Sequence, residues 1–147
     1  MKNKYTFFEF ILLFICGNLL FALPAFSQEN QVSSAVSLED KLIMDQAVMS
    51  ERIEDFAPVN SGVVFSIRMG KVSCFTSFGS VPNKTFIYHK WFHQDKLSTT
   101  KRLTLQTPRW STYSSIQLRE TDKGPWRVEI SDQKGNLLHI LRFSITD

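Results

Sequence analysis

The sequence predicts an all-β protein, an immunoglobulin-like antiparallel β-sandwich of about seven or eight strands preceded by a helical signal peptide. Two observations predict the sandwich. Short runs of alternating apolar and polar residues fill the chain after residue 42, and Gly, Pro, Asn and Asp separate these runs. No long stretch with the period of an amphipathic helix interrupts them. The likeness to immunoglobulin domains is one of layering, because the Cys-Trp-Cys pattern of antibody domains is absent.

The amino-terminal segment has the pattern of a secretory signal peptide. Lys2 and Lys4 give it a basic start, and residues 5–26 are predominantly apolar. Ala25 and Ser27 supply the small side chains that a signal peptidase accepts. We therefore expect residues 1–27 to be removed and the protein to reach the periplasm or the cell envelope.

The alternative is that residues 5–26 stay as an anchor in the inner membrane, since about 20 apolar residues can span a bilayer. Glu9 and Asn18 inside the apolar run, and the cleavage-like end of the run, disfavour this alternative. We expect contact with the membrane only if the segment is left uncleaved.

The remaining chain has the size of one domain. Residues 28–42 are polar and predict a tether, and residues 43–147 predict a single β-sandwich domain. Without the signal peptide the chain keeps 15 basic and 13 acidic residues, a formal charge of +2, so nucleic-acid binding is not expected. Cys74 is then the one cysteine left, and it cannot form a disulfide within the domain.

The first half of the domain predicts three strands. Met44–Ile53 is closed by turn residues around Pro58. Val63–Met69 and Val72–Phe78 alternate apolar and polar residues on either side of Gly70, where we expect a bend or bulge.

The second half predicts the rest of the sandwich. Phe86–His93 carries aromatic residues on both faces, so we expect an interior strand. Trp126, Val128 and Ile130 point toward the core in the strand Trp126–Ser131, which ends in a turn with Gly135 at positive φ. The other predicted strands are Leu97–Thr107, Trp110–Ile116 and a last one whose inward residues are Leu137, Leu141, Phe143 and Ile145.

Several short motifs, three of which contain a tryptophan, follow one another along the chain in the order and spacing of a known family. They are Ala47-Val48 with Arg52 and Pro58, Tyr88-His89-Lys90-Trp91, Arg109-Trp110-Ser111-Thr112-Tyr113-Ser114-Ser115, Gly124-Pro125-Trp126-Arg127-Val128-Glu129-Ile130, and Asp132 with Gly135. From about Ala47 to Ile145 the chain resembles the bacterial domain-of-unknown-function family numbered 2914. The resemblance implies an extracytoplasmic β domain and adds no catalytic residue. Ser111 stands where the motif favours a basic residue, which weakens an anion-binding role for that strand.

The residues capable of catalysis or metal binding have simpler interpretations. His89 and His93 lie about 13 Å apart along a strand, too far to share a metal ion, and His139 has no ligand pattern around it. Cys74 belongs to an alternating apolar face and is expected to be a small buried residue rather than a nucleophile. We therefore expect no metal and no cofactor.

Aromatic and basic residues give the candidate binding surface: Trp91, Arg109, Trp110 and Arg127. Exposed tryptophan rings stack on sugars, and arginine forks onto carboxylates or phosphates. In the alternative, Trp126 and one of the other two tryptophans fill the core and the arginines pack over aromatic rings as surface structure. Strand alternation places Trp126 in the core, and Trp110, at a strand start beside small hydroxyl residues, is expected to be exposed.

The sequence thus predicts a non-catalytic binding or interaction module of the periplasm or envelope, with an envelope protein or a glycan as partner. One alternative is a small envelope hydrolase or a thiol enzyme built around Cys74 or a histidine, which requires two titratable groups within hydrogen-bond reach. Another is the sensor part of a membrane-anchored assembly.

We predict that the exported protein begins at Gln28, because Ala25 and Ser27 occupy the small-residue positions of a cleavage site. Amino-terminal sequencing of the protein recovered from the envelope fraction checks this. A chain that still begins at Met1 there would contradict it.

Overall fold

The computed structural model describes residues 41–147, so the predicted signal peptide and the tether up to residue 40 lie outside the described residues. Nine strands occupy this part of the chain. They are β1 (Ile43–Glu54), β2 (Ala57–Ser61), β3 (Val64–Ser66), β4 (Lys71–Ser80), β5 (Thr85–His93), β6 (Lys96–Leu105), β7 (Trp110–Gln117), β8 (Gly124–Asp132) and β9 (Leu137–Thr146). Short 3-10 helices cover Ile67–Met69 and Glu120–Asp122. Within residues 41–147, no helix is long and apolar enough to cross a membrane.

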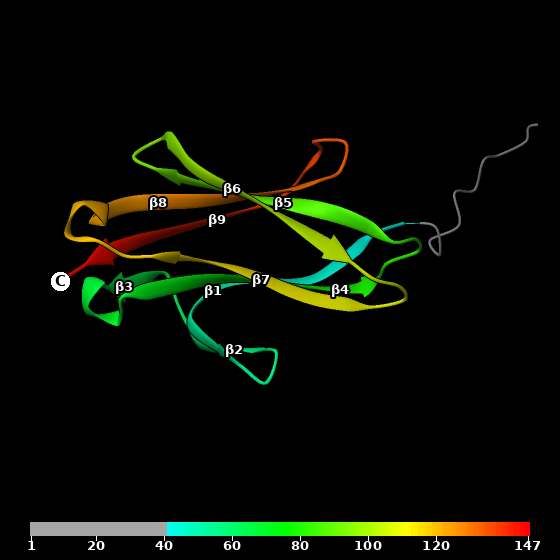
Figure 1. Ribbon diagram of the computed structural model, residues 1–147, viewed down its shortest axis with the longest axis horizontal. Coiled ribbons are helices and arrows are strands. Elements are labelled where there is room, and N and C mark those ends of the chain that lie inside the picture. Colours follow the sequence, from blue (N-terminus) through cyan, green and yellow to red (C-terminus); the bar gives the residue numbers. More distant parts are fainter. Residues whose placement is uncertain (1–40) are drawn as a thin grey trace, which may run out of the picture. The chain divides into compact units, whose positions relative to one another are not determined.

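Two sheets form the predicted sandwich, one above the other in Figure 1. The first sheet has the order β2-β1-β4-β7 and the second has the order β3-β9-β8-β5-β6. All neighbours are antiparallel except β3 and β9, which run parallel. β1, β4 and β7 take the places of strands A, B and E of an immunoglobulin fold, and β5, β8 and β9 those of C, F and G. The prediction of an all-β, immunoglobulin-like sandwich is confirmed.

The long strands lie where alternation predicted them, and the short ones do not. The segment around Pro58, expected as a closing turn, forms the edge strand β2 in a hairpin with β1. The expected strand Val63–Met69 is only three residues long as β3. Ser66 then caps a 3-10 helix through its side chain, and Gly70, at φ 68°, ends that helix. Side-chain alternation does not distinguish a short strand from a capped turn.

The last strand departs from prediction at one end. Phe143 and Ile145 are buried in the core as expected, but Leu137 is 56% exposed. A register shift between Ile130 and Ser131 breaks the β8–β9 ladder where Leu137 pairs with Ser131. The strand therefore leaves the core face at its beginning, and the inward assignment of Leu137 is wrong.

Aromatic rings fill one half of the core around Phe143. The Trp126 ring stacks on Phe143 with centroids 6.1 Å apart, and the Trp91 and Phe65 rings meet Phe143 edge-on at 6.1 Å and 6.0 Å. The Trp126 indole N–H donates to the carbonyl oxygen of Asp122 at 2.7 Å, so burial of the ring leaves no polar atom unpaired. The prediction that Trp126 lies in the core is confirmed.

We predict that Trp126→Ala lowers the free energy of unfolding by about 3 to 5 kcal/mol, because it removes a buried ring and leaves a cavity beside Phe143. Urea denaturation measures this loss. Trp110→Ala is the control and should change it by less than about 1 kcal/mol, as at other exposed positions. A tolerated Trp126→Ala with an unfolded Trp110→Ala would invert the face assignment.

Candidate binding site

The structure separates the four candidate residues into three environments. Trp91 is completely buried, and its indole N–H donates to Ser114 Oγ at 3.1 Å between the two sheets. Its ring cannot stack on a ligand at the surface, so the assignment of Trp91 to a binding surface is wrong. The aromatic residues on both faces of Phe86–His93 did not reveal which face turns inward, and register with β8 settles it.

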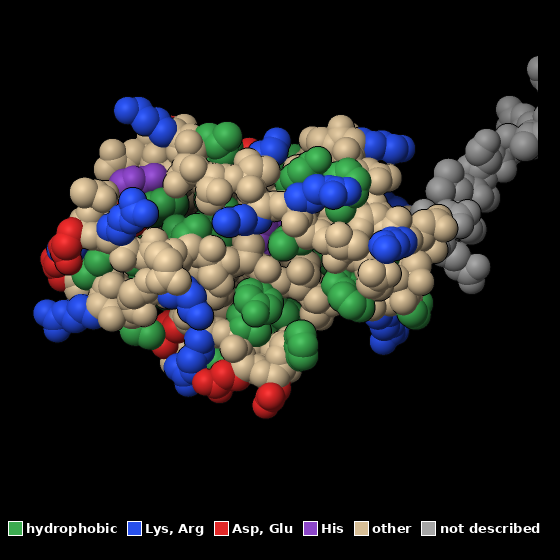
Figure 2. Space-filling model, viewed as in Figure 1, with side chains coloured by type: hydrophobic (Ala, Val, Ile, Leu, Met, Phe, Trp, Pro, Cys, Tyr) green, Lys and Arg blue, Asp and Glu red, His purple; other side chains and the backbone are tan. Residues whose placement is uncertain are grey.

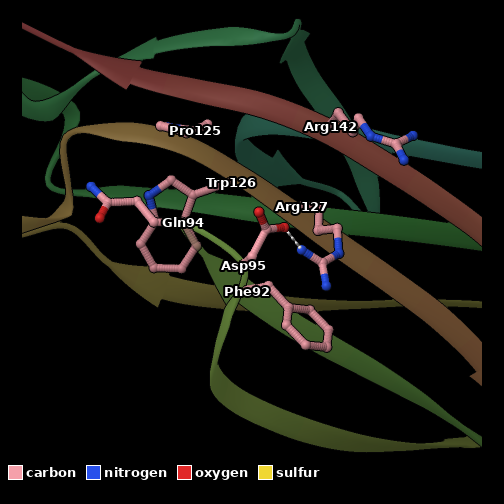
Figure 3. A pocket seen from close by; sticks show the side chains of 7 residues that line it. All are labelled: Phe92, Gln94, Asp95, Pro125, Trp126, Arg127 and Arg142. Carbon is pink, nitrogen blue, oxygen red and sulfur yellow. Dashed lines mark hydrogen bonds and ion pairs between the residues drawn. The ribbon is translucent and has the colours of Figure 1, made fainter.

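Arg127 is engaged within the domain. Its guanidinium forms ion pairs with Asp95 and with Glu129, the latter at 2.9 Å between Nε and Oε1, and it lies 4.0 Å above the Phe92 ring. Figure 3 shows Arg127, Asp95 and Phe92 beside Trp126. These residues line a hollow of about 120 Å³. The two carboxylates balance the charge of Arg127, whereas Arg142, which also lines this hollow, forms no ion pair within residues 41–147. Arg127 fits the alternative in which arginine packs as surface structure.

Arg109 and Trp110 lie together at a different place, the end of the first sheet where β7 begins. They line an open groove of about 470 Å³ together with Asp45, Phe56, Ser77, Phe78 and Ser111. Trp110 is 40% exposed, so the prediction that its ring reaches the surface is confirmed. Arg109 forms no ion pair with any residue of the described range 41–147. We call this the Trp110 groove.

The floor and the acidic side of the Trp110 groove come from the pairing of three strands. Ser77 of β4 lies opposite Ser111 of β7, and both hydroxyls face outward. Asp45 has no partner in the β1–β4 register, because a bulge lies between Met44 and Gln46. The bulge places the Asp45 carboxylate over Gly79. A Cβ atom on residue 79 would lie only 2.5 Å from Asp45 Oδ1. A glycine at this position therefore makes room for the carboxylate at the groove.

Phe56 forms the far rim of the groove from an unusual position. It is the second residue of the tight turn between β1 and β2, where both Asp55 and Phe56 have positive φ. Such turns favour Asn-Gly, since a side chain in the left-handed region costs free energy. Phe56 is nevertheless 81% exposed, so its ring gains little from burial. A strained backbone that holds an exposed aromatic ring is a feature associated with functional sites.

A second polar group of residues sits inside the sandwich. Trp91 Nε1–H donates to Ser114 Oγ, which lies 2.9 Å from His89 Nδ1, and His89 Nε2 lies 3.4 Å from Thr76 Oγ1. The Thr76 hydroxyl donates to the Thr112 carbonyl. One tautomer satisfies every partner: Ser114 donates to Nδ1, and the proton on Nε2 is donated to Thr76. The chain of hydrogen bonds thus requires a neutral imidazole.

The contact between Ser114 and His89 has the spacing of a nucleophile and its base, but its surroundings do not suit catalysis. His89 is fully buried, and burial lowers its pKa to about 4. The Ser114 hydroxyl is already bonded to Trp91 and His89. Cys74 is also fully buried, and burial raises the pKa of its thiol well above the ordinary range. In the described part of the chain, no three His, Cys, Asp or Glu side chains gather to hold a metal ion.

Residues 84–145 match the model of a family described as "Protein of unknown function (DUF2914)". Over this range the chain is similar to the DUF2914 family. The match begins at residue 84, so it is narrower than the resemblance expected from about Ala47. No curated protein matches the chain.

The DUF2914 region contributes Arg109, Trp110 and Ser111 to the groove, whereas Asp45 and Phe56 come from the chain before it. Sequence reasoning missed these last two. Asp55-Phe56 lies between two β-forming runs and is a signal for a hairpin tip. The alternation of residues was interpreted instead as one closing turn around Pro58, which included this pair. The bulge at Asp45 has no signal in the alternation of residues, because an inserted residue shifts the pattern without a marker of its own.

We predict that the domain loses stability as the pH falls. His89 binds a proton at about pH 4 when folded and near 6.5 when unfolded, so the unfolded state takes up more protons between these values. The free energy of unfolding should fall by about 3 kcal/mol from pH 7 to pH 4 through this residue alone. Denaturation at several pH values measures the slope.

The slope should flatten in His89→Gln and persist in His139→Gln, since His139 is exposed. If both variants keep the slope of the original protein, another group is responsible for it.

Proposed function

We propose that this protein is a non-catalytic binding module of the periplasm or cell envelope, and that it binds an acidic glycan in the Trp110 groove. The observation that carries the proposal is the pair of exposed aromatic rings, Phe56 and Trp110, on a groove that also holds an unpaired arginine. Export rests on the amino-terminal sequence, which has the basic start, apolar run and small residues of a signal peptide.

The chemistry of the groove suits a sugar chain. The face of a sugar ring is apolar and lies well on an aromatic side chain, while its edge carries hydroxyl groups that need hydrogen-bond partners. Ser77 and Ser111 offer hydroxyls at the floor, and Asp45 offers carboxylate oxygens that accept from sugar hydroxyls. Arg109 has the fork of donors that matches a carboxylate, which favours an acidic glycan over a neutral one.

The placement of reactive groups supports binding rather than turnover. Among the described residues, Ser114, His89 and Cys74 are nucleophilic or basic side chains that lie near one another. They lie between the two sheets and have little or no exposed surface. The groove itself carries one carboxylate, Asp45, and no histidine or cysteine. A general acid and base pair within reach of one ligand is therefore missing from the groove's lining.

We predict that Trp110→Ala and Phe56→Ala each weaken glycan binding at least tenfold, since losing an aromatic contact of about 1.4 kcal/mol corresponds to a factor of ten. An array of neutral and uronic-acid-containing oligosaccharides identifies a ligand, and calorimetry with the retained oligosaccharide measures affinity. Leu97→Ala is the matched control, because Leu97 is an exposed apolar residue of β6 outside the groove.

Arg109→Gln should remove the preference for acidic over neutral oligosaccharides while the domain stays folded. Retention of no oligosaccharide, or an affinity unchanged in Trp110→Ala, would contradict a glycan site in this groove.

A further inference from the structure

β7 is an edge strand whose open side is unusually free of charge. It pairs with β4 on one side and has no strand on the other within the described residues. Its sequence, Trp110–Gln117, contains no charged residue, no proline and no glycine. Exposed edge strands of this kind pair readily with another strand, and proteins usually prevent this with charges, prolines or short lengths.

The other three edge strands in residues 41–147 have such protection. β6 carries Lys96, Lys101 and Arg102. β2 is five residues long and contains Pro58, and β3 is three residues long. In Figure 2, Lys and Arg side chains lie over β6, whereas hydrophobic side chains lie over β7 beside the β1–β2 hairpin. The contrast singles out β7.

The backbone groups on the open side of β7 can be assigned from the ladder with β4. Leu118 N–H donates to the Gly70 carbonyl at 2.9 Å, and the register continues from this pair through Val72 and Ile116 to Phe78 and Trp110. Backbone groups alternate in direction along an antiparallel strand, so the even-numbered residues of β7 bond to β4. The N–H and C=O groups that point to the open edge belong to the odd-numbered residues Ser111, Tyr113, Ser115 and Gln117.

We propose that the domain forms a dimer in which β7 pairs antiparallel with β7 of a second copy, joining two first sheets into one continuous sheet. A twofold axis at Tyr113 places Tyr113 opposite its own copy and Ser111 opposite Ser115 of the second copy. All of these residues have backbone groups that face the open edge, so this register makes the paired hydrogen bonds of an antiparallel ladder. It also keeps outward side chains opposite outward side chains.

The occupant is a second copy of this chain because β7 complements itself. Two neutral edges meet without repulsion, and the twofold register sets hydroxyl against hydroxyl and one half-exposed tyrosine ring against another. A charged partner strand would find no opposite charge on β7. The dimer carries two Trp110 grooves on a shared sheet, which would strengthen binding to a repeating polymer, but dimerisation does not depend on the glycan.

Sedimentation equilibrium of the protein in the form recovered after export tests the proposal. The mass should approach that of two chains as the protein concentration rises to about 100 μM, where contacts of modest affinity are populated. Tyr113→Lys sets two like charges against each other on the axis and should weaken dimerisation at least tenfold. Thr100→Lys, at an exposed position of β6, is the matched control and should leave the mass unchanged from the original protein.

A covalent trap tests the register. In an antiparallel hydrogen-bonded pair the Cα atoms lie about 5.5 Å apart, a separation that a disulfide spans. Tyr113→Cys should therefore form a disulfide-linked dimer with oxidised glutathione, whereas Thr100→Cys should not, and the buried Cys74 should not compete. A monomer at all concentrations, a dimer unaffected by Tyr113→Lys, or equal cross-linking of the two cysteine variants would overturn the proposal. Because Phe56→Ala should affect glycan binding and leave dimerisation intact, the two proposals fail independently.

Discussion

The hydrogen bonds that join His89 and Trp91 of β5 to Ser114 of β7 are the constraint on which the rest of this structure depends. They connect the second sheet to the first through the middle of the core. Polar atoms buried there are costly unless every one is paired, and the chain from Trp91 to Thr112 pairs them in one direction. A different facing of the two sheets would leave an indole, an imidazole and two hydroxyls without partners.

The position of Ser114 determines what β7 presents outside. Because Ser114 faces the core, its neighbours Tyr113 and Ser115 face outward, and so does Ser111 at the floor of the groove. On the other sheet, Trp91 is held against Phe143, which in turn carries Trp126. This inward network thus fixes Trp91 and, through Phe143, Trp126 in the core. Trp110 lies opposite Phe78 on the same face as Ser114, and it reaches the surface because it stands at the start of β7, at the end of the sheet. The surface of the second sheet differs, since Arg127 is paired with carboxylates of the same domain.

Alternation along the chain was sufficient to predict the fold class, the long strands and the inward face of β8, because each of these depends on neighbours in sequence. It predicted the exposure of Trp110 from the small residues that follow it. It was wrong on Trp91, since both faces of β5 carry aromatic residues and only pairing with β8 decides between them. Asp45 and Phe56 were missed because a bulge and a strained turn, not a residue pattern, bring them to Arg109 and Trp110. The structural role of His89 in the core also depends on its hydrogen bond with Ser114, which lies 25 residues further along the chain.

Nuclear magnetic resonance of the three tryptophan indole N–H groups during titration with a uronic-acid oligosaccharide tests the central claim most directly, since each ring has its own environment. The Trp91 and Trp126 protons are bonded to Ser114 and Asp122 inside the domain. The Trp110 ring lies on the proposed groove. We predict that the Trp110 signal shifts progressively with added oligosaccharide while the Trp91 and Trp126 signals stay in place. A titration in which Trp110 does not move, or in which only a buried indole responds, would contradict the account.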